Sequence, residues 1–267
     1  MKLEYFFNRH PVFTGDELAV FLASKGPHNP RTQEALLLYH VKSGRLVRVR
    51  RGLYAVVPPG ASAASYPVDP FLLASRMTKD AILAYHTAME FHGKAYSVYE
   101  HFTYLSTAPA RPVSFRSQQF KGVRFSRALP PQVAASFGVV KADRAGLEVR
   151  VTGIERTFVD VLHRPGLAGS WEEIWRSLES VEFFDLDKVA AYVQHLGNAT
   201  TAAKVGFFLE QHRESLMVDE AHLKVLRDLR PQRPHYLERS QRKAGHFVAA
   251  WNLVVPQEVY ERSWEEP

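Results

Sequence analysis

Residues 29–54 read NPRTQEALLLYHVKSGRLVRVRRGLY, and this stretch decides the fold of the amino-terminal part of the chain. Asn29 followed by Pro30 predicts a helix start, because asparagine caps a first turn and proline fits the first helical position. The helix is expected to end just before Gly44, since glycine readily adopts the conformation that closes helices. The pattern then changes to alternating apolar residues around an arginine-rich tip at residues 50–52, which predicts a two-stranded hairpin.

A shorter helix is predicted just before this stretch, from about Gly15 to Ser24. Thr14 and Glu17 have the spacing of a capping box, in which both side chains satisfy backbone amides at a helix start. Helix, turn, helix and basic hairpin, in this order, define a winged helix-turn-helix. In such a fold the second helix enters the DNA major groove, so residues 1–58 are predicted to form a DNA-binding domain.

The distribution of charge supports this interpretation. Residues 1–58 carry nine Lys or Arg against four acids, so +5 of the total charge of +6 lies in this segment. Winged helices also serve as protein-docking modules, but basic residues clustered on the helix and the hairpin favour DNA. The first turn of the second helix would reach base edges and the remaining cations would contact phosphates. The candidate DNA-binding residues are Arg31, Thr32, Gln33, Lys42, Arg45, Arg48, Arg50 and Arg51.

Composition bounds the other possibilities. The chain has 267 residues, which favours two domains, and its 46% hydrophobic and 23% charged content is that of a globular protein. It contains no cysteine, so disulfides, thiolate zinc sites and cysteine nucleophiles are excluded. The first residues, MKLEYFFNRHP, lack the apolar region of a signal peptide, and no apolar stretch is long enough for a membrane helix. We therefore expect a cytoplasmic protein without a membrane partner.

The remainder of the chain predicts a linker at 59–67 and a second domain at 68–267. Helices are expected at about 69–77 and 80–92, followed by strands at 101–107, 113–116, 122–127, 137–141 and 147–151. Helix starts follow at the capping boxes beginning with Thr152 and Ser170, and at Asp185, Ala199 and Asp219, while residues 246–255 alternate weakly and predict a last strand that returns to the sheet. The fold class is therefore α+β: a winged helix-turn-helix followed by a mixed domain of a small antiparallel sheet with helices.

The search for catalytic motifs favours structural roles. Gly169-Ser170 with Asp185 and Asp187 resembles the signature of a metal-dependent nucleotidyltransferase, but Asp185 is better placed as a helix cap. Glu148-Val149-Arg150 approaches a nuclease motif but has arginine where lysine is needed. His86 and His92 are six residues apart, which does not place them on one helix face as metal ligands. We therefore expect no enzymatic activity, no cofactor and no metal.

Four stretches resemble the AbiEi family of antitoxins and transcriptional regulators, which belong to type IV toxin–antitoxin systems of the abortive-infection class. They are Leu46–Tyr54 (LVRVRRGLY), Asp69–Gly93 (DPFLLASRMTKDAILAYHTAMEFHG), Val151–Pro165 (VTGIERTFVDVLHRP) and Gly197–Glu210 (GNATTAAKVGFFLE). The resemblance implies an amino-terminal winged helix that binds the protein's own promoter, at half-sites that are inverted repeats. It also implies self-association on DNA, a carboxyl-terminal antitoxin domain and a nucleotidyltransferase toxin encoded nearby.

Three functions remain open at this point. The first is a repressor of its own operon that is also an antitoxin. The second is a solitary winged-helix regulator whose carboxyl-terminal domain binds another protein or a ligand. The third, disfavoured above, is a nucleotidyltransferase or nuclease that uses Asp185 and Asp187 as metal ligands.

Overall fold

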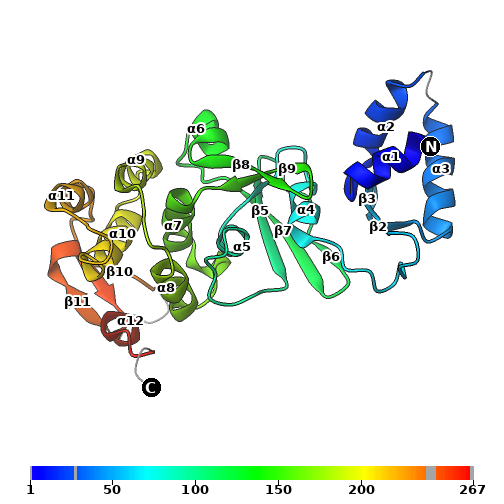
Figure 1. The fold of residues 1–267 in the computed structure, drawn as a ribbon. Helices are drawn as coiled ribbons and strands as arrows, with labels where there is room; N and C mark the ends of the chain where they lie inside the picture. The colour runs from blue at the N-terminus through cyan, green and yellow to red at the C-terminus, as the bar shows by residue number, and fades with distance from the viewer. Residues whose placement is uncertain (1, 27–28, 239–244, 265–267) are drawn as a thin grey trace. The chain divides into compact units, whose positions relative to one another are not determined.

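The structure is a computed structural model of the chain that describes residues 2–26, 29–238 and 245–264 (Figure 1). Packing divides the chain into two compact units. The first consists of the chain up to Leu83 together with Glu100–Arg124 and Lys141–Arg150. The second consists of Ala84–Tyr99, Phe125–Val140 and the chain from Val151 onward. The predicted division into a DNA-binding domain (residues 1–58), a linker (59–67) and a second domain (68–267) stays a prediction.

The first unit begins with the helices and the hairpin that the sequence predicted. Its elements are α1 (Lys2–Arg9), β1 (Val12–Thr14), α2 (Gly15–Ala23), α3 (Pro30–Lys42), β2 (Leu46–Arg50) and β3 (Leu53–Val56). The capping box of α2 is confirmed, because the Glu17 amide donates to the Thr14 hydroxyl at 3.2 Å and the Glu17 carboxylate accepts from the Thr14 amide at 2.6 Å. At α3, the Asn29 side chain accepts from the Arg31 amide, as a cap should.

Two amino-terminal elements, α1 and β1, were not predicted. β3 is the central strand of a three-stranded sheet and pairs antiparallel with both β1 and β2. The buried core of this part gathers side chains from α1, the sheet and both following helices: Phe6, Phe7, Phe13, Leu18, Leu37, Leu46 and Val56. Because α1 supplies two of these phenylalanines, it is part of the core and not an appended tail.

A second, six-stranded sheet follows. Its strands are β4 (Ile82–Leu83), β5 (His101–Ser106), β6 (Val113–Phe115), β7 (Gln118–Arg124), β8 (Val139–Arg144) and β9 (Leu147–Thr152), in the spatial order β6-β7-β5-β4-β9-β8. The helix α4 (Pro70–Ser75) is capped by Asp69 and contacts β4 and β5. The α+β class is confirmed, with more than one sheet.

The prediction of a purely antiparallel sheet is wrong. β5 and β7 are parallel, with Phe102 opposite Phe120. β6 turns directly into β7 as an antiparallel hairpin, and β7, the second strand of that hairpin, lies against β5. The connection between β5 and β6 therefore passes over the position that β7 fills, which makes β7 run in the direction of β5.

The helix predicted at 80–92 is also corrected. Ile82 and Leu83 form β4, which pairs antiparallel with β5, and the helix α5 begins later (His86–Phe91). Tyr85 has a φ of 58°, outside the right-handed helical region, so a helix cannot continue through it. Both β4 side chains are completely buried, and a short apolar run of this kind fits a central strand as well as a helix.

The second unit is mainly helical. Besides α5 it contains α6 (Pro131–Ser136), α7 (Ile154–His163), α8 (Trp171–Glu179), α9 (Leu186–Leu196), α10 (Ala199–Gln211), α11 (Glu220–Asp228), α12 (Gln257–Glu261) and 3-10 turns at Pro165–Leu167 and Ala249–Trp251. α7 and α10 are its most buried helices, and α7 contacts α5, α9 and α10.

The carboxyl-terminal strands do not return to the six-stranded sheet, as the sequence had suggested. β10 (His235–Tyr236), β11 (His246–Val248) and β12 (Leu253–Val255) form a separate sheet in the order β10-β12-β11. Figure 1 shows this sheet beside α10 and α12. Its central strand contacts α10, so α10 already provides the apolar surface that the last strands cover.

The predicted helix caps are confirmed with one exception. Ser170, Asp185 and Asp219 each accept a hydrogen bond from a backbone amide of the first turn of α8, α9 and α11. Thr152 does not cap α7, which begins after Gly153. The Thr152 hydroxyl is buried and pairs with that of Thr157 at 2.7 Å, because β9 continues through this residue.

Candidate nucleic-acid interface

The first turn of α3 presents its polar side chains to solvent. Arg31 and Thr32 are exposed, while Gln33 is half-buried and its side-chain amide donates to the Gly15 carbonyl at 2.7 Å. Gln33 therefore fixes the start of α3 against the start of α2. Arg31 and Thr32 are the two residues of this turn that are available to a groove.

The hairpin divides its arginines between solvent and the interior. Arg48 and Arg51 are exposed, whereas the Arg50 guanidinium donates to the Met77 carbonyl. The register of the hairpin shifts between Arg48 and Arg50, and this irregularity turns Arg50 away from the exposed row. Gly52 has a φ of 79°, which the tight turn after the arginines requires.

The two remaining candidate cations differ in their surroundings. Lys42 is exposed in the last turn of α3. The Arg45 side chain is only 14% exposed and donates to Glu4 at 2.6 Å, and this hydrogen bond lowers the pKa of the Glu4 carboxyl. Arg45 therefore ties the start of β2 to α1. The assignment of all eight candidates to DNA contact stays a prediction.

A shallow groove of about 250 Å³ runs between α3 and the hairpin. Arg48 and Arg51 lie on its hairpin side, and Glu34 lies on its helix side. Tyr54 also lines it but stacks on Phe13 with ring centroids 5.7 Å apart, which holds its ring against the core. The groove therefore places two cations beside the exposed face of α3.

Two exposed apolar residues on α3 escaped the sequence prediction. Leu38 is 55% exposed and Tyr39 is 66% exposed. The signal was present, since residues 36–39 read LLLY and a helix cannot turn four consecutive apolar side chains towards one core. Apolar groups on such a helix can contact thymine methyl groups or another protein surface.

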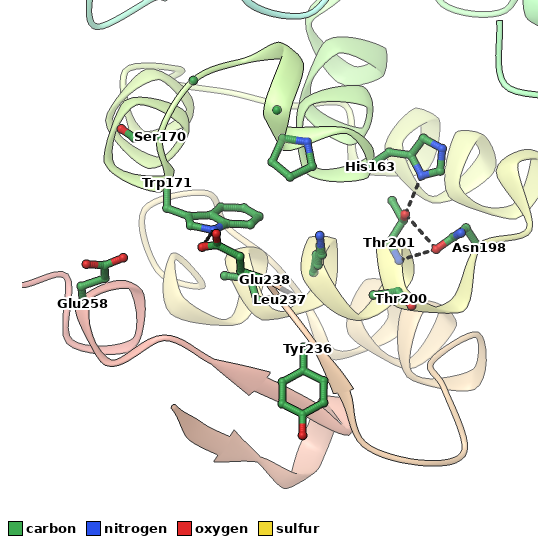
Figure 2. A pocket seen from close by; sticks show the side chains of 14 residues that line it. His163, Ser170, Trp171, Asn198, Thr200, Thr201, Tyr236, Leu237, Glu238 and Glu258 are labelled. Carbon is green, nitrogen blue, oxygen red and sulfur yellow. Dashed lines mark hydrogen bonds between the residues drawn. The ribbon is translucent and has the colours of Figure 1, made fainter. Parts of the chain in front are cut away.

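The second unit has a cavity of about 590 Å³ between α8, α10 and the carboxyl-terminal segments. Figure 2 shows His163, Thr201 and Asn198 joined by hydrogen bonds, and Trp171 close to Glu238. Thr201 donates its one hydroxyl proton to Asn198, so it accepts from Nδ1 of His163, which leaves Nε2 of that ring as an acceptor.

The same cavity holds a buried cation. The Lys204 side chain is 7% exposed, and its ammonium lies 3.3 Å from the Leu162 carbonyl and 5.1 Å from the centre of the Trp171 ring. Burial, with the nearby charges of Arg164 and Lys204, lowers the pKa of His163 to about 4, so this ring is neutral at pH 7. A cation, a neutral acceptor and a carboxylate in one pocket can bind a small polar molecule.

The residues of the nucleotidyltransferase-like motif have structural surroundings. Asp185 accepts from the Lys188 amide as the cap of α9, and the Asp187 side chain is 95% exposed. His86 is buried and hydrogen-bonded to Glu173 at 3.0 Å, which is a structural role. Within the described residues, no group of three or more acidic or histidine side chains has the arrangement of a metal site.

Comparison with known proteins supports the amino-terminal assignment. Residues 1–57 match the model of a family described as "Transcriptional regulator, AbiEi antitoxin", which confirms the resemblance over that segment. No curated protein matches the chain significantly.

The fold as a whole is similar to that of the RV2827C protein from Mycobacterium tuberculosis. The crystal structure of that protein aligns over 99% of this chain and 94% of its own, with a TM-score of 0.68 and 18% sequence identity. In the described part of the chain, no helix has the length and apolar character needed to cross a membrane.

Proposed function

We propose that the protein is a winged-helix transcriptional repressor of its own operon and the antitoxin of a type IV toxin–antitoxin system. The observation that carries the DNA-binding part is the placement of exposed side chains within the segment that matches the family. Arg31 and Thr32 are exposed at the start of α3, and Arg48 and Arg51 are exposed on the hairpin.

In this proposal α3 enters the major groove and the β2–β3 hairpin is the wing. Arg31 and Thr32 contact base edges, since they lie in the first turn of the recognition helix. Arg48, Arg51 and Lys42 contact phosphates, which fixes the orientation of the protein without reading sequence. The operator consists of inverted half-sites, so two copies bind together.

A gel shift with the protein's own upstream DNA tests sequence recognition. We expect specific retardation that an unrelated competitor does not remove. The double variant Arg31→Ala, Thr32→Ala should lose at least about thirtyfold of the preference for upstream DNA, because each of two good base contacts contributes about 1–3 kcal/mol of discrimination. As a matched control, Arg111→Ala with Lys121→Ala changes two exposed residues of the same unit and should retain the preference. Equal retardation of upstream and unrelated DNA by the unmodified protein would contradict the proposal.

Co-expression with a neighbouring nucleotidyltransferase gene tests the antitoxin part. The unmodified protein should restore growth. The variant Arg48→Ala, Arg51→Ala should also restore growth when expressed from an independent promoter, because those residues are assigned to DNA alone. Failure of the unmodified protein to restore growth would leave a solitary regulator.

A solitary regulator that binds a ligand is the second candidate, and the cavity around Lys204 favours it. That cavity has about 590 Å³ and polar walls, which suits a small molecule. We propose no enzymatic activity, since Asp185 caps α9 and Asp187 is a surface residue. Nucleotide transfer that disappears in Asp185→Asn would overturn this.

A further inference from the structure

A second cavity lies in the first unit, beside the hairpin. It has a volume of about 830 Å³. Its walls come from α1 and α2, from the turn between β2 and β3, from residues 75–81 and from β9. Arg50, one of the residues predicted to contact DNA, faces this cavity and not the exposed row of the hairpin.

Arg50 and Arg76 place two guanidinium groups in the wall of this cavity. Arg50 donates to the Met77 carbonyl, but its Nε is buried and has no hydrogen-bond partner among the described residues. The Arg76 side chain is 11% exposed, and its Nε is also buried without a hydrogen bond. Buried donors without acceptors are costly, so Arg50 Nε favours an acceptor supplied from outside the chain. Arg76 Nε faces the Glu17 carboxylate at 3.4 Å and adds a second positive charge to the wall.

The acids of the cavity are already engaged with other groups. Glu17 accepts two hydrogen bonds from Thr14 at Oε2, and its other oxygen, Oε1, lies 3.4 Å from Arg76 Nε. Asp16 pairs with Lys79 at 2.8 Å, and Glu148, the third acid in the wall, pairs with Lys141 at 3.1 Å. Within the described part of the chain, Arg50 has no acidic partner within ion-pair distance. The cavity therefore has cationic donors in excess of acceptors.

The rest of the cavity wall is apolar. Phe6, Phe21, Met77 and Ala81 contribute to its walls, and Val20 at its edge is 72% exposed. Phe6, Met77 and Ala81 are already buried, so a bare inorganic anion would leave mainly Phe21 and Val20 in contact with water. A carboxylate attached to an apolar body satisfies both parts, since the carboxylate binds guanidinium groups and the body covers the apolar wall.

We propose that this cavity binds a small organic carboxylate, with Arg50 and Arg76 holding the carboxylate. We also propose that the ligand regulates DNA binding, and this second step rests on the proposed function. In the structure Arg50 faces the cavity, so the predicted contact of Arg50 with DNA requires its guanidinium to leave the Met77 carbonyl, and a ligand that holds Arg50 in the cavity opposes that movement. Ligand and DNA therefore compete for one guanidinium, and each weakens the binding of the other by the same factor.

The test uses 1-naphthoate as a fluorescent probe and 1-naphthalenemethanol as its uncharged analogue, with the full chain at constant ionic strength. We expect the carboxylate to bind at least about tenfold more tightly than the alcohol, the size of one charge-assisted hydrogen bond. Arg50→Gln should abolish this preference. Arg51→Gln, the matched control, should retain it, because Arg51 is exposed and does not line the cavity.

Equal binding of the two probes, no binding of either, or an equal loss in both variants would overturn the ligand site. If Arg50→Gln fails to fold, the comparison of the two probes on the unmodified protein still tests whether the cavity binds a carboxylate. Regulation is read separately, as a weaker affinity for upstream DNA when naphthoate is present. An unchanged affinity for DNA would overturn the competition between ligand and DNA but not the ligand site. If the protein does not bind DNA at all, the proposed function is overturned, and the probe titration still tests the ligand site.

Discussion

Replacing Gly206 by alanine is expected to destabilise the second unit, although the same change stabilises most helices. Gly206 lies inside α10, where alanine is favoured over glycine by about 1 kcal/mol. A Cβ at this position would lie 2.1 Å from Cζ3 and 2.2 Å from Cη2 of Trp251. The indole cannot retreat, because it is fully buried and its Nε1 donates to Glu210 at 2.7 Å.

The magnitude follows from these opposing effects. Overpacking costs about 1–3 kcal/mol, and the overlap here is large enough to place the cost at the upper end. After the gain in helix propensity, the net loss in unfolding free energy should be about 2 kcal/mol. Urea unfolding followed by tryptophan fluorescence measures it, since all four tryptophans lie in the second unit.

Two comparisons test the reasoning. Gly166→Ala is the control, because no atom lies within 4 Å of the position of its Cβ, and it should change the stability little. In a Trp251→Ala background the obstacle is absent, so Gly206→Ala should stabilise by about 1 kcal/mol. A Gly206→Ala protein as stable as the unmodified one, or an equal loss in both backgrounds, would refute the steric explanation.

Two further predictions concern protonation. Although burial alone would raise the pKa of Asp80, hydrogen bonds from Ser106 and Thr107 hold this pKa well below its ordinary value. The stability lost in Asp80→Asn should therefore be constant above about pH 5 and shrink as the pH falls below about 4. A difference in urea unfolding that does not depend on pH would contradict this. For His163, burial lowers the pKa to about 4, so its ring signals in an NMR titration should shift near that pH. The pH range between about 4 and 6.5 is where the unfolded chain binds the extra proton, so this residue should make stability rise with pH there, and a midpoint near 6.5 would contradict the buried position.

The amino-terminal helices could be predicted because their signals are local. The cap at Thr14 and the proline after Asn29 act within one turn of the helices that they begin. α1 and β1 lack such signals. β1 becomes a strand through pairing with β3, where Val12 lies opposite Ala55, and nothing near Val12 in the sequence indicates that partner. Pairing over such a distance is a property of the whole fold.

The same distinction explains the errors in the large sheet. A pattern of apolar residues predicts that a strand exists but not which strand lies beside it, so the parallel pairing of β5 with β7 was not accessible. Ile82 and Leu83 fit a helix or a strand equally well by local pattern. Their pairing with β5, which lies far away in the sequence, makes them a strand.

For the candidate interface, the charge of the segment was predictable but the partners of its cations were not. Arg45 reaches Glu4, 41 residues away, and Arg50 reaches the Met77 carbonyl, 27 residues away. Gln33 bonds to the Gly15 carbonyl, 18 residues away. A count of basic residues assigns Arg45 and Arg50 to the surface, whereas these contacts hold both within the unit.

The salt dependence of DNA binding tests the central claim most directly. The affinity for the protein's own upstream DNA is measured at several salt concentrations for the unmodified protein, for Arg48→Ala with Arg51→Ala, and for the control pair Arg111→Ala with Lys121→Ala. Each lost phosphate contact lowers the slope of log affinity against log salt by about 0.9, so the hairpin variant should lose about two units and the control none. Equal slopes for all three proteins, or no binding by the unmodified chain, would contradict the account.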